Sequence, residues 1–155
     1  MESPPVLVYR FEHFIHRLGL RRLAVLIAWL NRLVFATWLP GSANIGRNFV
    51  VGYWGLGIVI HSDASIGDNC WISQNVTIGR KGSDKRVPVI GNNVYIGAGA
   101  VIVGEIEIGD NSIIGANSFL NISVPPGSLV AGVPAKIIRS INNEPREELK
   151  RARND

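Results

Sequence analysis

His61 is the residue best suited to proton transfer in this chain, because it is the only histidine beyond residue 16. It ends an apolar run at residues 58–60 and follows a glycine-rich stretch that holds Tyr53 and Trp54. An imidazole titrates near neutral pH, so it can serve as a general base. Two interpretations stay open: His61 is a catalytic base for which the glycines leave room, or a surface histidine at the edge of a strand.

Basic residues form a second group of side chains that could bind a ligand. Such clusters suit anionic ligands or anionic surfaces. The cluster in the middle of the chain consists of Arg80, Lys81, Lys85 and Arg86. We expect no metal site, because one histidine in this part of the chain cannot supply the three protein ligands of a catalytic zinc.

The bulk composition bounds the fold and the compartment. The chain has 155 residues, of which 46% are hydrophobic and 18% charged, which is typical of one folded domain. A single cysteine fits a reducing compartment, so we expect a cytoplasmic protein without a secretory signal. The apolar runs at residues 23–30 and 33–39 are too short for a spanning helix of about 20 residues.

A repeat of six residues is the strongest pattern in the sequence. It places two inward residues in every six, which an α-helix with 3.6 residues per turn cannot do. Short strands joined by tight turns, three to a coil, do fit it. We therefore predict a mainly β fold, a left-handed parallel β-helix of hexapeptide repeats over residues 40–140. The repeated aliphatic positions are Ile60, Ile66, Ile72, Ile78, Ile90, Ile96, Ile102, Ile108, Ile114 and Leu120.

The repeat is interrupted twice. Nine residues separate Val51 from Ile60, so about three extra residues lie near Tyr53 and Trp54. The stretch "GRKGSDKRVPV" replaces the pattern at residues 79–89 and predicts a basic loop that leaves the coil. After residue 124 two prolines end the coil, and residues 137–138 predict a last strand.

The flanks of the coil differ from it in composition. Residues 1–39 predict two helices broken near Gly19, with a stop at residues 40–41. These helices are strongly apolar and carry several arginines. That pattern favours packing on a partner subunit, and the alternative is contact of residues 6–39 with a membrane surface. Residues 141–155 form a polar tail, with a short helix expected after Pro145.

The stretch from "VPVIGNNVYIGAGA" to "AGVPAKIIR" resembles the hexapeptide-repeat acetyltransferases. The branch it is most similar to is the serine acetyltransferase-like one, which includes O-acetyltransferases of surface-polysaccharide synthesis. The resemblance covers residues 40–140. It implies that acetyl-CoA binds in a groove between neighbouring β-helices of a homotrimer, with no metal.

The resemblance also assigns site residues. Small residues let the pantetheine arm of the cofactor lie close to the backbone. Lys136 and Arg139 would bind its phosphates. Apart from the resemblance, Tyr53 and Trp54 in their glycine-rich loop would offer an aromatic platform for a sugar ring. Arg86, with the other basic residues of its loop, would face a coenzyme A phosphate or an anionic acceptor. The remaining cofactor-binding candidates are Ala98, Gly99, Ala100, Gly115, Ala116, Asn117, Gly132 and Pro134.

The expected catalytic residues of the serine enzymes are replaced in this chain. The base histidine falls on Trp54, or on Tyr53 if the insertion is counted differently, and its carboxylate partner falls near Trp38. A second family histidine falls on Val87. His61 is then the nearest titratable group, and we predict that it is the catalytic base.

These observations predict an acetyl-CoA-dependent O-acetyltransferase whose acceptor is a sugar or a surface-polysaccharide precursor. One alternative is a serine O-acetyltransferase. The other is a non-catalytic hexapeptide-repeat scaffold or regulator, which the replaced histidines favour. We expect a homotrimer that acts on a small-molecule or glycan acceptor, with no nucleic-acid partner. The expected location is the cytoplasm, with peripheral contact at the inner membrane face.

Overall fold

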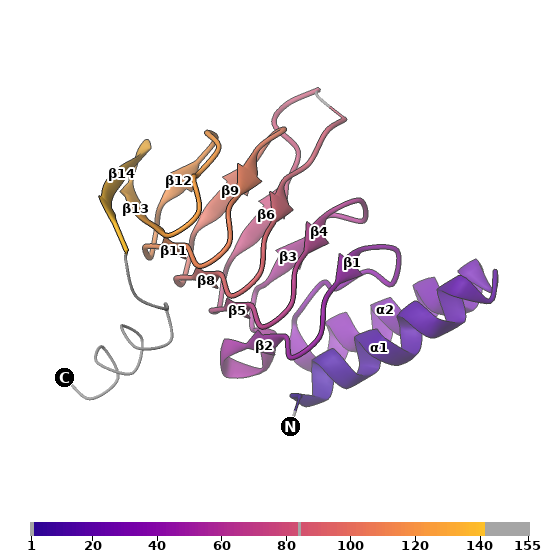
Figure 1. Cartoon of the computed structure of the whole chain (residues 1–155). Helices are drawn as coiled ribbons and strands as arrows, with labels where there is room; N and C mark the ends of the chain where they lie inside the picture. The colour runs from indigo at the N-terminus through magenta and orange to yellow at the C-terminus, as the bar shows by residue number, and fades with distance from the viewer. Residues whose placement is uncertain (1, 84, 142–155) are drawn as a thin grey trace.

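The chain folds into a three-sided parallel β-helix with a helical hairpin at its N-terminal end (Figure 1). The computed structural model describes residues 2–83 and 85–141. The predicted β-helix of hexapeptide repeats is confirmed. The tail helix expected after Pro145 lies outside the described residues.

Three sheets form the sides of the β-helix. The first sheet has the order β1 (Asn44–Ile45), β4 (Ser65–Ile66), β7 (Val89–Ile90) and β10 (Glu107–Ile108). The second has the order β2 (Val50–Val51), β5 (Trp71–Ile72), β8 (Tyr95–Ile96), β11 (Ile113–Ile114), β13 (Ser128–Gly132) and β14 (Ala135–Ser140). The third has the order β3 (Val59–Ile60), β6 (Thr77–Gly79), β9 (Val101–Val103) and β12 (Phe119–Leu120).

The repeated aliphatic residues fill the interior of the coils. Ile66, Ile90 and Ile108 are register partners in the first sheet, and each is about 2% exposed. The second inward position, four residues later, is equally buried, as Cys70 and Val76 show. A large and a smaller side chain thus alternate around each coil in the close-packed interior. Burial raises the pKa of the Cys70 thiol to about 11, so this cysteine is a core residue.

The N-terminal hairpin consists of α1 (Pro4–Arg17) and α2 (Arg21–Phe35). The break near Gly19 is confirmed, since this glycine has a φ of 82°. The expected helical stop at residues 40–41 is wrong. The helix α2 ends at Phe35 because Ala36 takes a left-handed φ of 53°. Trp38 then already forms a bridge with Val59 of the first coil.

The hairpin closes the N-terminal end of the β-helix through α1. The Tyr9 hydroxyl donates to the Ala43 carbonyl at 2.8 Å. The Arg10 guanidinium donates to the Ile45 carbonyl at 2.6 Å and is paired with Glu2. Neither described helix is long and apolar enough to cross a membrane.

The C-terminal end of the β-helix is closed by a β-hairpin. Strands β13 and β14 pair antiparallel, whereas the pairs between coils are parallel. The last strand predicted at residues 137–138 is therefore confirmed, as part of β14. This hairpin extends the second sheet beyond the last strands of the other two sheets.

Candidate functional site

One corner of the prism carries most of the predicted cofactor residues. We call it the small-residue corner; it comprises the turns that lead from the second sheet to the third. Backbone hydrogen bonds join each turn to the next over the full height of the coil. The donors and acceptors are Asn117 N to Ala98 O at 2.8 Å, Gly99 N to Gln74 O at 2.9 Å, Asn75 N to Leu56 O at 2.8 Å, and Gly57 N to Ala36 O at 2.9 Å.

Close contact between successive turns explains the small residues at this corner. A Cβ on Gly97 would lie 2.5 Å from the Ala116 nitrogen. Gly99 has a φ of 71°, and a Cβ there would lie 2.2 Å from Oδ1 of Asn117. Ala116 and Asn117 themselves are exposed, and Ala98 is half-buried. The corner therefore presents a track of backbone and short side chains to a ligand.

Ala100 differs from the other cofactor candidates. Its side chain is fully buried among the core residues, so within the protomer it supports the turn from inside. Gly132, the last residue of β13, and Pro134, in the turn that leads to β14, are both exposed. The Gly132 N–H donates to the Ser118 hydroxyl at 3.2 Å, which ties this turn to the small-residue corner.

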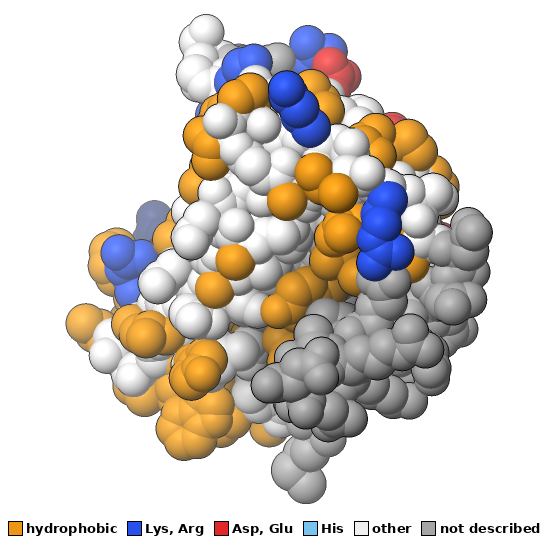
Figure 2. All heavy atoms as spheres, turned by 90° about the vertical axis from the view of Figure 1, so that its left-hand side faces the viewer, with side chains coloured by type: hydrophobic (Ala, Val, Ile, Leu, Met, Phe, Trp, Pro, Cys, Tyr) orange, Lys and Arg blue, Asp and Glu red, His pale blue; other side chains and the backbone are white. Residues whose placement is uncertain are grey.

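The two predicted phosphate ligands lie on β14, and both are exposed. Lys136 pairs with Ala131, whose Cβ lies over Gly115, so this lysine stands beside the small-residue corner. Arg139 pairs with Leu129, farther along the hairpin. Figure 2 shows this end of the molecule, where Lys and Arg side chains stand at several points and Asp and Glu are scarce.

The insertion near Tyr53 and Trp54 lies at the N-terminal end of the same corner. It forms the short helix η1 (Gly52–Gly55), in which Tyr53 and Trp54 both have left-handed dihedral angles, with φ values of 48° and 54°. Two such residues in succession are costly unless the surroundings hold them, and strained residues of this kind cluster at functional sites. Their side chains are 79% and 60% exposed.

An apolar hollow of about 480 Å³ lies between this insertion and the end of α2. The Trp54 ring meets the Phe35 ring edge-on, with the centroids 6.0 Å apart. None of the described residues that line the hollow carries a charge. The prediction from sequence missed the Phe35 side of the hollow, because it extended the helix past this residue. The lining residues are Val34, Phe35, Ala36, Tyr53, Trp54 and Leu56.

His61 lies at a different corner. We call this the histidine corner; it comprises the turns that lead from the third sheet back to the first. Nδ1 of His61 accepts a hydrogen bond from the Asp63 N–H at 3.1 Å. The hydrogen of the neutral ring therefore lies on Nε2, which makes this atom a donor. Asp63 also contacts Arg80, whose Nη2 lies 3.6 Å from the carboxylate.

Arg86 belongs to the histidine corner as well. The basic loop leaves the coil after β6 and returns at β7, as predicted (Figure 1). Arg86 forms an ion pair with Glu105, which follows β9 at this corner. Val87, at the position of the second family histidine, is half-buried. One protomer thus keeps His61 and Arg86 apart from the small-residue corner, with the third sheet between them.

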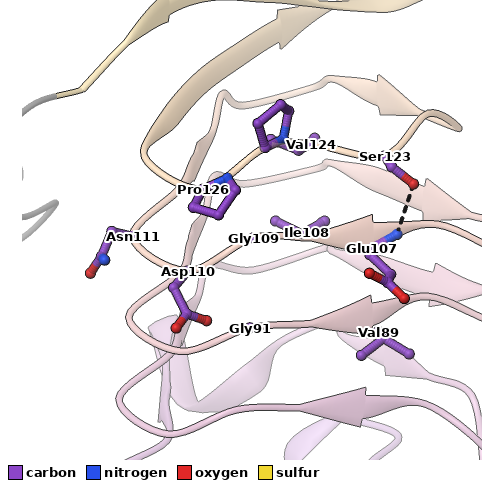
Figure 3. Close-up of a pocket in the computed structure, with 11 residues that line it drawn as sticks. Val89, Gly91, Glu107, Ile108, Gly109, Asp110, Asn111, Ser123, Val124 and Pro126 are labelled. Carbon is purple, nitrogen blue, oxygen red and sulfur yellow. Dashed lines mark hydrogen bonds between the residues drawn. The ribbon is translucent and has the colours of Figure 1, made fainter.

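A second hollow, of about 800 Å³, lies along the first sheet at its C-terminal end (Figure 3). Its lining includes Val89, Glu107 and Pro126, and the Glu107 N–H donates to the Ser123 hydroxyl at 3.1 Å. None of the predicted site residues lines it. Within residues 2–83 and 85–141, no cluster of three or more potential metal-ligating side chains is found.

Comparison with known proteins agrees with this architecture. Residues 88–121 match the family model "Bacterial transferase hexapeptide (six repeats)". The serine acetyltransferase of Synechococcus elongatus is 37% identical over 132 residues, which are 84% of this chain and 54% of that protein. The serine acetyltransferase of Helicobacter pylori strain J99 is 36% identical over 135 residues, which are 86% of this chain and 78% of that protein.

Solved structures show the same likeness in three dimensions. The serine acetyltransferase of Brucella abortus in complex with coenzyme A superimposes with a TM-score of 0.85 at 33% identity. The match covers 88% of this chain and 55% of that one. The chain thus spans about half the length of the S. elongatus and B. abortus proteins. By its β-helix and these identities, it belongs to the bacterial hexapeptide-repeat transferase family, which includes the serine acetyltransferases.

Proposed function

We propose that the protein is an acetyl-CoA-dependent O-acetyltransferase. The observation that carries this proposal is the small-residue corner, which runs as one track of backbone from the β13–β14 turn to the insertion at Trp54. Short side chains let an extended pantetheine arm approach the backbone, and Lys136 stands beside the track as a cation for the phosphates. A solved relative was crystallised with coenzyme A.

Serine is the acceptor that the names of the relatives support, ahead of the glycan favoured by the sequence. A sugar acceptor is the second candidate, and the hollow at Trp54 favours it. Free serine carries an ammonium and a carboxylate, which need charged or hydrogen-bonding partners. The lining of the hollow is apolar and aromatic, which suits the apolar face of a sugar ring better.

The reaction itself requires little covalent chemistry from the protein. The acceptor hydroxyl oxygen attacks the thioester carbonyl carbon, the C–O bond forms and the C–S bond breaks. The hydroxyl proton leaves and the coenzyme A thiol takes up a proton. Base catalysis at Nε2 of His61 needs the ring tautomer that gives up the hydrogen bond from Asp63. Donation from Nε2–H to the developing oxyanion needs no such change.

A homotrimer would bring the two corners together. In a trimer of prisms, the small-residue corner of one protomer would face the histidine corner of its neighbour. Each groove would then hold the cofactor track and aromatic hollow of one subunit, and His61 and Arg86 of the next. We propose that the trimer is the form in which the site is complete.

The proposal is tested by calorimetry with acetyl-CoA and by release of the coenzyme A thiol. We expect micromolar binding and turnover with either L-serine or a hexose from a panel of sugars. The variant Ala116→Glu places a large charged side chain on the exposed track, and it should abolish binding because it keeps the pantetheine arm away from the backbone. Absence of binding in the unchanged protein would overturn the proposal in favour of a non-catalytic scaffold, which the replaced histidines at Trp54 and Val87 favour.

A further inference from the structure

The N-terminal hairpin exposes an unusual amount of apolar surface. On α1 and its C-cap residue Leu18, one stripe of large side chains recurs at the spacing of a single helix face. Each member is more than half exposed, and patches of this kind on a folded protein mark interaction surfaces. The stripe consists of Leu7 at 52%, Phe11 at 57%, Phe14 at 58% and Leu18 at 58%.

The second helix exposes an apolar face of its own. Only Ala24, Ala28 and Asn31 of α2 are buried. At 100° per residue, the exposed apolar side chains span about half of the helix circumference. They are Leu23, Val25, Leu26, Trp29, Leu30, Leu33 and Val34, with exposed fractions from 44% to 77%.

The charges on the hairpin have one sign. Four arginines are exposed on it, namely Arg17, Arg21, Arg22 and Arg32. Glu12 is the only acidic residue between positions 3 and 62, and its side chain is 2% exposed. The hairpin therefore presents apolar and cationic groups with no exposed carboxylate among residues 3–62.

This charge pattern distinguishes between two possible partners of the apolar face, a second copy of the hairpin and a membrane surface. A two-fold contact between copies of the hairpin would place the same arginines near one another, with no carboxylate to neutralise them. A surface that carries anionic head groups above an apolar layer complements both features at once. The position of the hairpin agrees, because the loop that joins its helices lies at its far end from the coils (Figure 1).

We propose that the hairpin binds the surface of a membrane that contains anionic phospholipid. The apolar side chains of α1 and α2 enter the boundary between head groups and acyl chains, and the arginines contact phosphates. Val34 belongs both to the exposed face of α2 and to the lining of the hollow at Trp54. Binding would hold that hollow near the lipid surface. The binding itself is independent of any acetyltransferase activity.

Cosedimentation with lipid vesicles tests this proposal on the full chain. We expect binding to vesicles of phosphatidylcholine with phosphatidylglycerol, weakening as salt is raised, and little binding to phosphatidylcholine alone. Replacing both Arg21 and Arg22 with Ser should weaken binding about 10- to 30-fold. Leu33→Asp should also weaken it, and its 77% exposure leaves folding intact. Lys85→Ser, in the distant basic loop, is the matched control and should bind like the unchanged protein.

Three results would overturn the proposal. One is absence of binding to the anionic vesicles. Another is equal binding by the double arginine variant, with circular dichroism showing an unchanged fold. The third is self-association in light scattering that Leu33→Asp abolishes while vesicles stay unbound, since this would identify a second copy as the occupant. None of these results depends on acetyl-CoA, so thiol release assays report separately on the proposed function.

Discussion

At the scale of single residues, Trp54, or Tyr53 beside it, stands where we expect a base in the serine acetyltransferases. Trp54 has a left-handed backbone, and its ring meets Phe35 edge-on in the lining of the apolar hollow. His61 is the titratable side chain left nearby, and its hydrogen bond from Asp63 makes Nε2 a donor in the neutral ring. Two roles for this residue, base and oxyanion donor, can be separated by substitution.

The variants His61→Ala and His61→Gln distinguish those roles. Loss of either role should lower kcat by about 100-fold or more in the alanine variant, with little change in KM for acetyl-CoA. Glutamine retains an N–H donor but cannot act as a base. It should therefore recover much of the activity if His61 donates to the oxyanion, and none if His61 is the base.

The control for this pair is Asp63→Asn, which keeps the backbone N–H that His61 accepts. It should retain nearly full activity in the thiol release assay. Full activity in both His61 variants would show that this residue has no catalytic role and is a surface histidine at a corner.

At the scale of secondary structure elements, the buried carboxyl group of Glu12 links α1 to the start of the β-helix. Oε1 of Glu12 accepts a hydrogen bond from the Gly41 N–H. Oε2 is buried without a partner among the described residues. Burial raises the pKa of Glu12 from 4.5 to about 7, and the Gly41 hydrogen bond opposes this shift only in part. The buried site therefore favours the neutral form of the Glu12 carboxyl group.

This carboxyl group predicts a pH-dependent stability. The folded state holds the Glu12 proton up to about pH 7, whereas the unfolded chain releases it near pH 4.5. The free energy of unfolding should therefore fall as pH rises between these values, by about 3 kcal/mol at most, and stay level above them. Glu12→Gln should remove this dependence and be more stable than the unchanged protein at pH 8.

Urea unfolding at pH 5 and pH 8 measures the difference. The exposed carboxylate of Glu107 supplies a matched control, since Glu107→Gln should follow the pH profile of the unchanged protein. If the unchanged protein and Glu12→Gln lost the same stability between the two pH values, Glu12 would not be protonated in the folded state.

At the scale of the whole molecule, the candidate site is divided between two corners of one prism. Among the residues that the structure describes, the turns of the small-residue corner carry no histidine or carboxylate, and the histidine corner lacks the track proposed for the cofactor. A trimer solves this only if each groove takes one corner from each neighbour. That arrangement predicts that two different inactive variants can complement one another.

Coexpression of His61→Ala with Ala116→Glu tests this arrangement. In randomly mixed trimers, about a quarter of the grooves would combine an intact track with an intact His61, so about a quarter of the activity should return. The two variants purified separately and then mixed without subunit exchange should stay inactive. A monomeric mass near 16.9 kDa by light scattering would rule out the arrangement.

The sequence by itself determined the coil. Residues such as Ile66 and Cys70 recur with a strict period and face inward, so local spacing dictates which side chains meet between coils. The same period exposed the insertion at Tyr53 and Trp54 and the basic loop, because each breaks the count. The end of α2 could not be derived this way, because it depends on a tertiary contact. Ala36 takes a left-handed conformation, and the chain then reaches Val59, with which Trp38 forms a bridge.

Only the tertiary structure decided where the candidate residues meet. Hexapeptide spacing tells which residues lie at corners, but the stacking of coils decides which corner each one shares. It joined Leu56, beside Trp54, to the turns of Ala98 and Asn117 along one backbone ladder. It placed His61 at another corner, together with the ion pair of Arg86 and Glu105. Phe35 reached the hollow from a helix outside the repeat. These contacts depend on how distant segments pack, which the spacing of the repeat does not specify.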